Sequence, residues 1–303
     1  MFRRFSRSPE TGTSTLEQRH AAVRRAAVDA LARRGITVTP APEDAPGDDW
    51  FVGSDGMQYR LYNLQLQCAQ LPAQDWPRAV EGHFDRLLAG RTAARPADLG
   101  DAELLAQIRT RLNPPEVGAM VSMSYARPAF GGLLAGLSRD LPTTVHTVGD
   151  QDVAGRDLDL LYQAGQRNTD AEPMSLQRLD HGVVAVTGES YFIASKALNI
   201  PALIRTAFGG AAPLGVVFSV PHRSLLFLHA VGPTTIDAVG WIASVTVGQA
   251  EEAPGGALSR DSFYWYGGAT QCITAIDTTA KSIDLQVDGP FADALNAVAA
   301  DVG

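Results

Sequence analysis

The chain has 303 residues, of which 45% are hydrophobic and 19% are charged. This composition excludes a disordered, collagen-like or coiled-coil protein, and the length allows one large domain or two of ordinary size. Acidic residues outnumber basic ones by 33 to 25, and the net charge of −8 makes nucleic acid an unfavourable partner. The charge is unevenly spread, because residues 1–34 carry +5, which leaves −13 on the rest of the chain.

The sequence predicts a cytoplasmic protein that does not enter a membrane. The basic start of the chain is followed by Glu10 and Glu17 rather than by the apolar stretch of a secretory signal. The best candidate for a membrane helix, residues 214–220, falls well short of the roughly 18 apolar residues that are needed. Cys68 and Cys272 are too distant for a zinc spacing and too few for a disulfide-built fold, so we expect reduced, buried thiols.

The first part of the chain predicts a helix–hairpin–helix grouping. Residues 1–14 are a flexible basic tail without periodicity, and apolar residues at helical spacing then predict a helix over 15–35. Alternating apolar residues predict a hairpin over 50–66, around a Gly-Ser-Asp-Gly turn. Two further helices are expected, one after Asp75 and one over 99–112.

Pro114-Pro115 is the best boundary candidate, so the sequence predicts an N-terminal subdomain over 15–115 and a C-terminal subdomain over 116–303. Residues 236–247 fit either a helix or a strand. In the second subdomain we expect strands at 121–125, 141–148, 183–187, 216–220, 225–230, 262–266, 271–277 and 282–287, and helices at 157–167, 192–208 and 290–302, of which 192–208 should be interrupted at Pro201. Segregated hairpins and helices indicate an α+β fold with antiparallel hairpins and helices packed on one face.

No motif in the sequence points to a metal or a cofactor, and we expect neither. Residues 150–159 resemble a calcium loop, but Ala154 and Leu161 occupy two positions that need an oxygen ligand. An acidic turn that feeds a helix, with Asp157 or Asp159 at the helix start, is the preferred interpretation. The six histidines are scattered, and neither a hydrolase elbow nor a phosphate-binding glycine loop is present.

Two places could carry recognition. His222 and Arg223 stand at the tip of a hairpin between apolar strands, where an imidazole can be exposed, although a loop histidine that bonds nearby backbone is the favoured alternative. In the aromatic run 263–266, Tyr264 and Tyr266 share one face of a strand and could form a recognition surface. Cross-strand packing is the favoured alternative for these tyrosines.

Residues 218–227, with Ser219-Val220-Pro221-His222 between two hydrophobic strands, resemble the YtpQ-like family of uncharacterised bacterial proteins. Residues 191–198 resemble the aromatic and Ala-Ser-Arg helix start of that family, and 121–130 resemble its Arg-containing loop. Asn168 stands where a family helix ends in Asn-Leu, although Thr169 replaces the leucine. The resemblance implies the same order of elements over most of the chain, and it brings neither a reaction nor catalytic residues.

These observations favour a non-catalytic, cytoplasmic protein-binding or regulatory protein, of the kind that immunity and adaptor proteins represent. The negative charge of −13 on residues 35–303 would select a basic protein partner. The alternative is an enzyme whose site is assembled by the fold from His146, His181, His222 and the acidic segment 150–159. The candidate binding residues are therefore His222, Arg223, Tyr264, Tyr266 and Asn168, and no catalytic residue is assigned.

Overall fold

The computed structural model describes residues 16–40, 50–91, 94–141, 144–253, 255–277, 279 and 282–302. The chain forms two units, Met1–Leu88 and Ala89–Gly303, and each is described by itself. The predicted basic tail, 1–14, lies outside the described residues. The division falls well before Pro114-Pro115, where the sequence suggested a boundary, because those prolines follow a strand that belongs to the second unit.

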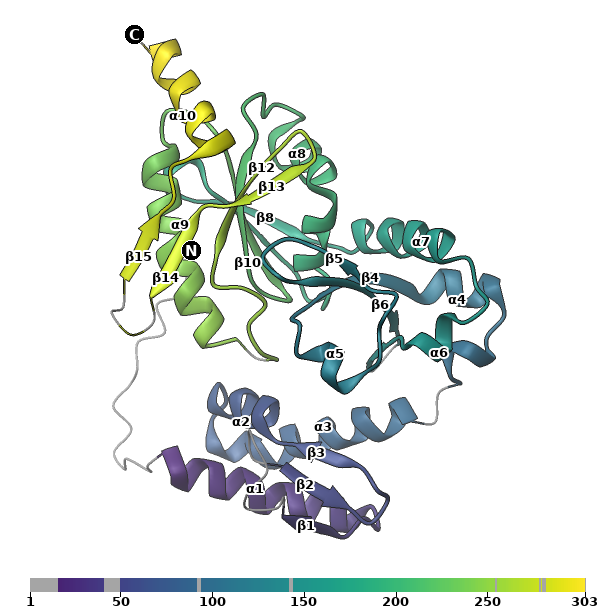
Figure 1. Ribbon diagram of the computed structural model, residues 1–303. Helices are drawn as coiled ribbons and strands as arrows, with labels where there is room; N and C mark the ends of the chain where they lie inside the picture. Colours follow the sequence, from purple (N-terminus) through teal and green to yellow (C-terminus); the bar gives the residue numbers. More distant parts are fainter. Residues whose placement is uncertain are drawn as a thin grey trace. The chain divides into compact units, whose positions relative to one another are not determined.

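The first unit is a three-stranded antiparallel sheet with helices (Figure 1). Its elements are α1 (Leu16–Arg33), β1 (Val38–Pro40), β2 (Trp50–Gly53), β3 (Gln58–Arg60), α2 (Tyr62–Ala69), the 3-10 helix η1 (Ala73–Asp75) and α3 (Trp76–Arg91). The predicted hairpin forms, but its second strand ends at Arg60. Residues 62–69 are helical because Leu61, Leu64 and Cys68, at helical spacing, all enter the core.

The second unit begins with a small sheet of order β4-β6-β5, in which β7 also pairs with β6. Its elements are η2 (Pro96–Asp98), α4 (Asp101–Gln107), β4 (Ile108–Asn113), α5 (Val117–Met120), β5 (Arg127–Pro128), β6 (Leu134–Asp140), β7 (Val145–Thr147), α6 (Asp150–Val153) and α7 (Leu158–Asp170).

Two predictions were wrong in this region. The helix expected over 99–112 ends at Gln107 and becomes a strand, because Ile108, Thr110 and Leu112 are buried with a period of two. Residues 121–125 are not a strand. There the Tyr125 hydroxyl donates to the carbonyl of Val148 at 2.7 Å instead.

The larger sheet has the antiparallel order β13-β12-β10-β11-β9-β8. Its region contains β8 (Ser175–Arg178), η3 (Asp180–Gly182), β9 (Val184–Thr187), η4 (Ala194–Asn199), α8 (Ile200–Phe208), β10 (Val216–His222), β11 (Leu225–Ala230), α9 (Thr235–Glu251), β12 (Ser262–Tyr266) and β13 (Ala269–Cys272). The hairpin of β14 (Thr274–Asp277) and β15 (Ser282–Leu285) and the helix α10 (Gly289–Val302) complete the chain. The interruption predicted at Pro201 is the junction of η4 and α8, where Pro201 occupies the tolerated first turn.

Helices cover both faces of the larger sheet. On one face Phe218 packs with residues of η4 and α8, and on the other Val217 and Phe227 pack with residues of α9 and α10. The α+β class is confirmed, but the expectation of helices on a single face is not met, because successive residues of β10 are all buried. The ambiguous segment 236–247 is part of α9.

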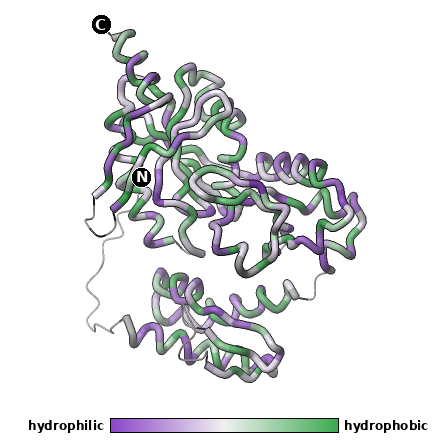
Figure 2. Tube along the Cα trace, in the orientation of Figure 1, coloured by the Kyte–Doolittle hydropathy of each residue, from purple (hydrophilic) through white to green (hydrophobic). Residues whose placement is uncertain are grey.

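Hydrophobic and hydrophilic residues are interspersed along helices such as α1 and α7 (Figure 2). Within the part of the chain that the structure describes, no helix is long and apolar enough to cross a bilayer. Both cysteines are free, and Cys68 is buried as expected, whereas Cys272 is exposed on an end strand of the larger sheet.

Candidate anion-binding site

Three segments of the second unit lie together: β4, which is an end strand of the small sheet, residues 190–195, and the β10–β11 turn. The backbone N–H of Leu112 in β4 donates to the Ser195 hydroxyl at 2.9 Å, so the segment 190–195 lies next to this strand. The same segment holds the β10–β11 turn, because the N–H of Ala194 donates to the carbonyl of Arg223 at 3.0 Å. The Ser224 hydroxyl adds a bond of 3.4 Å to the carbonyl of Ser190.

The Arg223 side chain is held in place from two directions. Its guanidinium carbon lies 3.9 Å from the centroid of the Tyr191 ring, a cation–π contact. It also packs on Gly255, where an added β-carbon would stand only 2.6 Å from Nη1 of Arg223. Gly255 has a φ of +94°, so both its conformation and the arginine favour glycine at this position.

Arg111 in β4 is partly buried, and its positive charge and that of Arg223 repel each other. Burial and then the positive charge of Arg223 lower the pKa of Arg111 to about 10. Burial also lowers the pKa of Arg223, while Tyr191 acts in the opposite direction on both arginines. Both remain cations at neutral pH. Among the described residues, no carboxylate forms an ion pair with either guanidinium.

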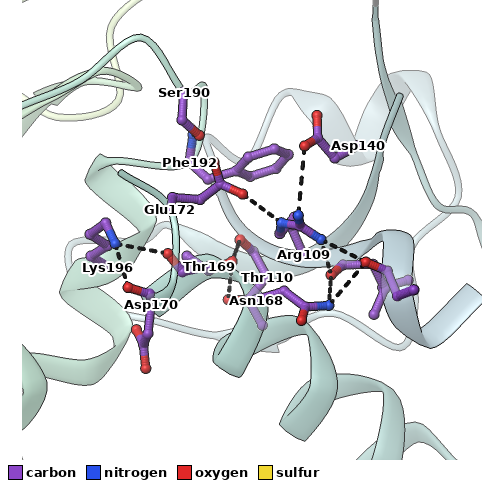
Figure 3. A network of polar contacts seen from close by, with 12 residues as sticks. Arg109, Thr110, Asp140, Asn168, Thr169, Asp170, Glu172, Ser190, Phe192 and Lys196 are labelled. Atoms are coloured by element: carbon purple, nitrogen blue, oxygen red, sulfur yellow. Dashed lines mark hydrogen bonds and ion pairs between the residues drawn. The ribbon is translucent and has the colours of Figure 1, made fainter. Parts of the chain in front are cut away.

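The neighbouring Arg109 in β4 is a partly buried arginine that carboxylates of this chain do neutralise (Figure 3). Its Nε donates to Oε1 of Glu172 at 2.7 Å, and its Nη2 lies 3.8 Å from Oδ2 of Asp140. Its Nη1 donates to the carbonyls of Ala106 and Ile108 at 3.1 Å. Arg109 is therefore fully engaged within the protein, whereas the pair Arg111 and Arg223 has no anion of its own among the described residues.

Of the five residues predicted from the sequence, Arg223 and His222 belong to this site. The Nδ1 atom of His222 accepts a hydrogen bond from the Ser224 N–H at 3.3 Å. This agrees with the interpretation favoured from the sequence, a loop histidine that bonds nearby backbone. Burial lowers the pKa of His222, and a side-chain bond with Gln249 raises it to a smaller extent.

The other three predicted residues lie elsewhere. Asn168 in α7 donates from Nδ2 to the carbonyls of Leu105 and Ile108, both at 2.8 Å, and so fastens the junction of α4 and β4 (Figure 3). Tyr264 is 2% exposed, and its hydroxyl donates to the carbonyl of Leu214 at 2.7 Å. Tyr266 is 52% exposed beside α10. Tyr264 is therefore a packing residue, whereas Tyr266 lies at the surface.

The three histidines of the enzyme alternative have separate surroundings. His181 Nδ1 lies 3.9 Å from Oδ2 of Asp237, His146 is in β7 near Arg139, and His222 is in the β10–β11 turn. Across the described ranges, no group of three His, Cys, Asp or Glu residues is arranged to hold a metal ion.

The acidic segment 150–159 is used within the protein itself. Asp150 accepts the Ser122 hydroxyl at 2.6 Å, and Asp157 caps α7 by accepting the Leu160 N–H at 3.0 Å. The preferred interpretation, an acidic turn that feeds a helix, is confirmed for Asp157.

Arg111 was not found from the sequence. It lies in a segment that was expected to be helical, and its partner Arg223 is distant along the chain, so only the alternation Ile108-Arg-Thr-Arg-Leu112 could have indicated its place on a strand. No family model, no curated protein and no solved structure matches this chain. The site is therefore interpreted from its own chemistry.

Proposed function

We propose that this chain is a cytoplasmic binding or regulatory protein that recognises an anionic group with Arg111, Arg223 and Tyr191. The observation that carries the proposal is the pairing of two partly buried guanidiniums without a carboxylate partner among the described residues. Removing a cation from water is costly unless an opposite charge compensates, and a bound anion supplies that charge. Arginine also presents a planar set of donors that suits carboxylates and phosphates.

Binding is favoured over catalysis by the residues around the pair. Arg223 is stacked on Tyr191, and His222 is engaged by backbone, which suits recognition of a charged group. The membership in the YtpQ-like family stays a prediction beside this proposal. A basic protein partner for residues 35–303, which carry −13, also stays a prediction, because the arginine pair attracts an anion and does not bear on that partner. Co-purification at low and at high salt tests it.

The experiment is a titration of the full chain with sulfate, inorganic phosphate and acetate at constant ionic strength, followed by calorimetry and by thermal unfolding. Arg111→Gln and Arg223→Gln should each weaken anion binding about tenfold or more, because each removes half of the positive charge. Arg205→Gln is the matched control, since it removes one exposed arginine of α8. The proposal fails if no anion binds, or if all three variants bind like the wild type.

A pair of glycines provides a second test that leaves the charge unchanged. Gly255→Ala places a methyl group against Nη1 of Arg223, whereas Gly256→Ala, at a similar φ of +87°, meets nothing within 4 Å. Both variants carry comparable backbone strain. Only Gly255→Ala should weaken anion binding, and equal affinity in the two variants would show that the position of Arg223 does not matter.

A further inference from the structure

The strand β13 is an end strand of the larger sheet, and one side of its backbone has no neighbouring strand. The Ile273 N–H donates to the carbonyl of Ser262 at 2.9 Å, which fixes the alternation of bonds between β12 and β13. By this alternation Gln271 faces β12, whereas the N–H and carbonyl groups of Thr270 and Cys272 point away from it. These outward groups make no hydrogen bond to any described residue, and both residues are exposed. We call this outward side of β13 the β13 edge.

The β13 edge lacks the proline and the charged side chains that commonly prevent a sheet from pairing with another chain. Its four residues, Ala269–Cys272, include neither. The opposite end strand, β8, is preceded by Pro173 and carries Arg178, whose Nη2 donates to the carbonyl of Ala207 at 3.1 Å. Outward main-chain groups on an end strand can accept an extended segment as an additional strand. Of the two end strands, β13 is therefore the better suited to strand addition.

A cavity of about 580 Å³ lies on one face of the β13 edge. Thr270 stands opposite Trp265 in the β12–β13 pair, and both line the cavity together with Phe130, Ile200 and Pro201. Side chains of paired residues share a face of a sheet, and their β-carbons stand about 5 Å apart. A residue that pairs with Thr270 from an added strand would therefore direct its side chain toward this cavity, whose walls are largely aromatic and aliphatic.

The surroundings of β13 restrict the charge of a segment that could bind there. Residues 261–303 contain six aspartates and one basic residue, Lys281, so their side chains carry −5. One carboxylate is placed at β13 itself, because Nε2 of Gln271 donates to Oδ1 of Asp288 at 2.7 Å. Gln271 belongs to the face of β13 opposite to that of Thr270. This charge would repel a second copy of the same region and attract a basic segment.

We propose that the β13 edge binds an extended, basic segment of a partner protein as an added strand of the larger sheet. The outward groups of Thr270 and Cys272 supply main-chain hydrogen bonds, and an apolar or aromatic side chain of the segment occupies the cavity beside Thr270. Lysines on the other face of the segment meet the acidic side of β13. The β13 edge includes neither Arg111 nor Arg223, so this proposal does not depend on the proposed anion site.

A synthetic peptide tests the proposal on the full chain. The probe is acetyl-Lys-Val-Lys-Phe-Lys-Val-Lys-amide, whose alternation puts lysines on one face of a strand and apolar side chains on the other. Fluorescence anisotropy of the labelled peptide measures its affinity. Replacing the lysines by glutamate, or the phenylalanine by serine, should weaken binding about tenfold or more, because the first reverses the charge and the second empties the cavity.

Two methylated peptides test the main-chain bonds without a change of charge. The phenylalanine that pairs with Thr270 directs its own N–H toward β13, whereas the N–H of the lysine before it points away. An N-methyl group on the phenylalanine should therefore weaken binding about tenfold or more, and the same group on that lysine should have little effect.

Proline substitutions in the protein locate the added strand. Thr270→Pro removes one outward N–H and leaves the β12–β13 bonds intact, so it should fold and weaken peptide binding about tenfold or more. Leu176→Pro is the matched control on β8, where the Leu179 N–H donates to the carbonyl of Val183 at 2.8 Å and so directs the Leu176 N–H outward. This control should bind the peptide like the wild type, and circular dichroism confirms that both variants are folded.

The exposed Cys272 thiol reports directly on the same place, since Cys68 is buried. The bound peptide should slow the alkylation of Cys272. No binding of the probe, equal affinity for the two methylated peptides, or equal affinity in Thr270→Pro and the wild type would overturn the proposal. Self-association of the chain that protects Cys272 without peptide would assign the β13 edge to a second copy and overturn it as well. Arg223→Gln should bind the peptide like the wild type, and a loss of binding there would place the peptide elsewhere and overturn the proposal.

Discussion

Replacing Arg111 by methionine should make the ligand-free protein more stable. The guanidinium is partly buried beside Arg223, and its pKa falls to about 10. Each pKa unit corresponds to about 1.36 kcal/mol, so the drop from a usual value above 12 sets an upper limit of about 3 kcal/mol on the cost of this cation in the folded state. Since the side chain retains some contact with water, we expect Arg111→Met to raise the free energy of unfolding by about 1–2 kcal/mol.

Arg109→Met is the matched control in the same strand, and it should act in the opposite direction. It leaves Glu172, whose side chain is 13% exposed, without its close ion-pair partner. We expect a loss of about 1–3 kcal/mol, because an uncompensated charge remains in a partly buried place.

Urea unfolding in a buffer without phosphate or sulfate measures both effects. Arg111→Met should shift the midpoint upward and raise the melting temperature by about 2–4 °C for each kcal/mol gained. Added phosphate should stabilise the wild type and have little effect on this variant, because only the wild type binds it. A loss of stability in Arg111→Met as large as in Arg109→Met would refute the reasoning, since it would mean that Arg111 is already neutralised within the protein.

Three further predictions concern the hairpin, the first unit and metal ions. His222→Ala should lower the free energy of unfolding by about 0.5–1.5 kcal/mol, the value of one net hydrogen bond, whereas Val220→Asp, at a fully buried position, should abolish the folded circular dichroism spectrum. Burial lowers the pKa of His83 to about 4, so the unfolded chain takes up a proton that the folded one resists. Stability should therefore be constant above about pH 7 and fall as the pH drops from about 6.5 toward 4, and His83→Gln should flatten that part of a pH series of urea melts. EDTA should leave the melting temperature unchanged; a drop of several degrees that one divalent ion restores would contradict this and point first to Asp150 and Asp152.

The sequence predicts elements well where local pattern and tertiary surroundings agree. The β10–β11 hairpin is an example, because two continuous apolar runs flank Pro221-His222-Arg223-Ser224 and both strands are buried in the middle of the sheet. The helix expected over 99–112 fails for the opposite reason. Its first half is helical, no glycine or proline marks the change at Gln107, and only pairing with β6 makes a strand of 108–113.

The candidate site was accessible from the sequence only in part. Arg223 belongs to a motif that stands out locally, so it was among the predicted binding residues. Arg111 becomes informative only when the fold places it beside a second cation, and no pattern along the chain encodes the absence of a counter-charge. Asn168 and Tyr264 were predicted as binding residues from the sequence, but their side chains donate hydrogen bonds to backbone carbonyls within the fold.

The central position of the β10–β11 hairpin has a consequence for the speed of recognition. Its strands have neighbours on both sides, β12 and β9, and helices on both faces, so their amide hydrogens should exchange with solvent only when the unit unfolds as a whole. Arg223 projects from the end of this slowly exchanging element. A ligand would thus meet a cation that is already in position, with little ordering to be done on arrival, and association should proceed in one concentration-dependent step.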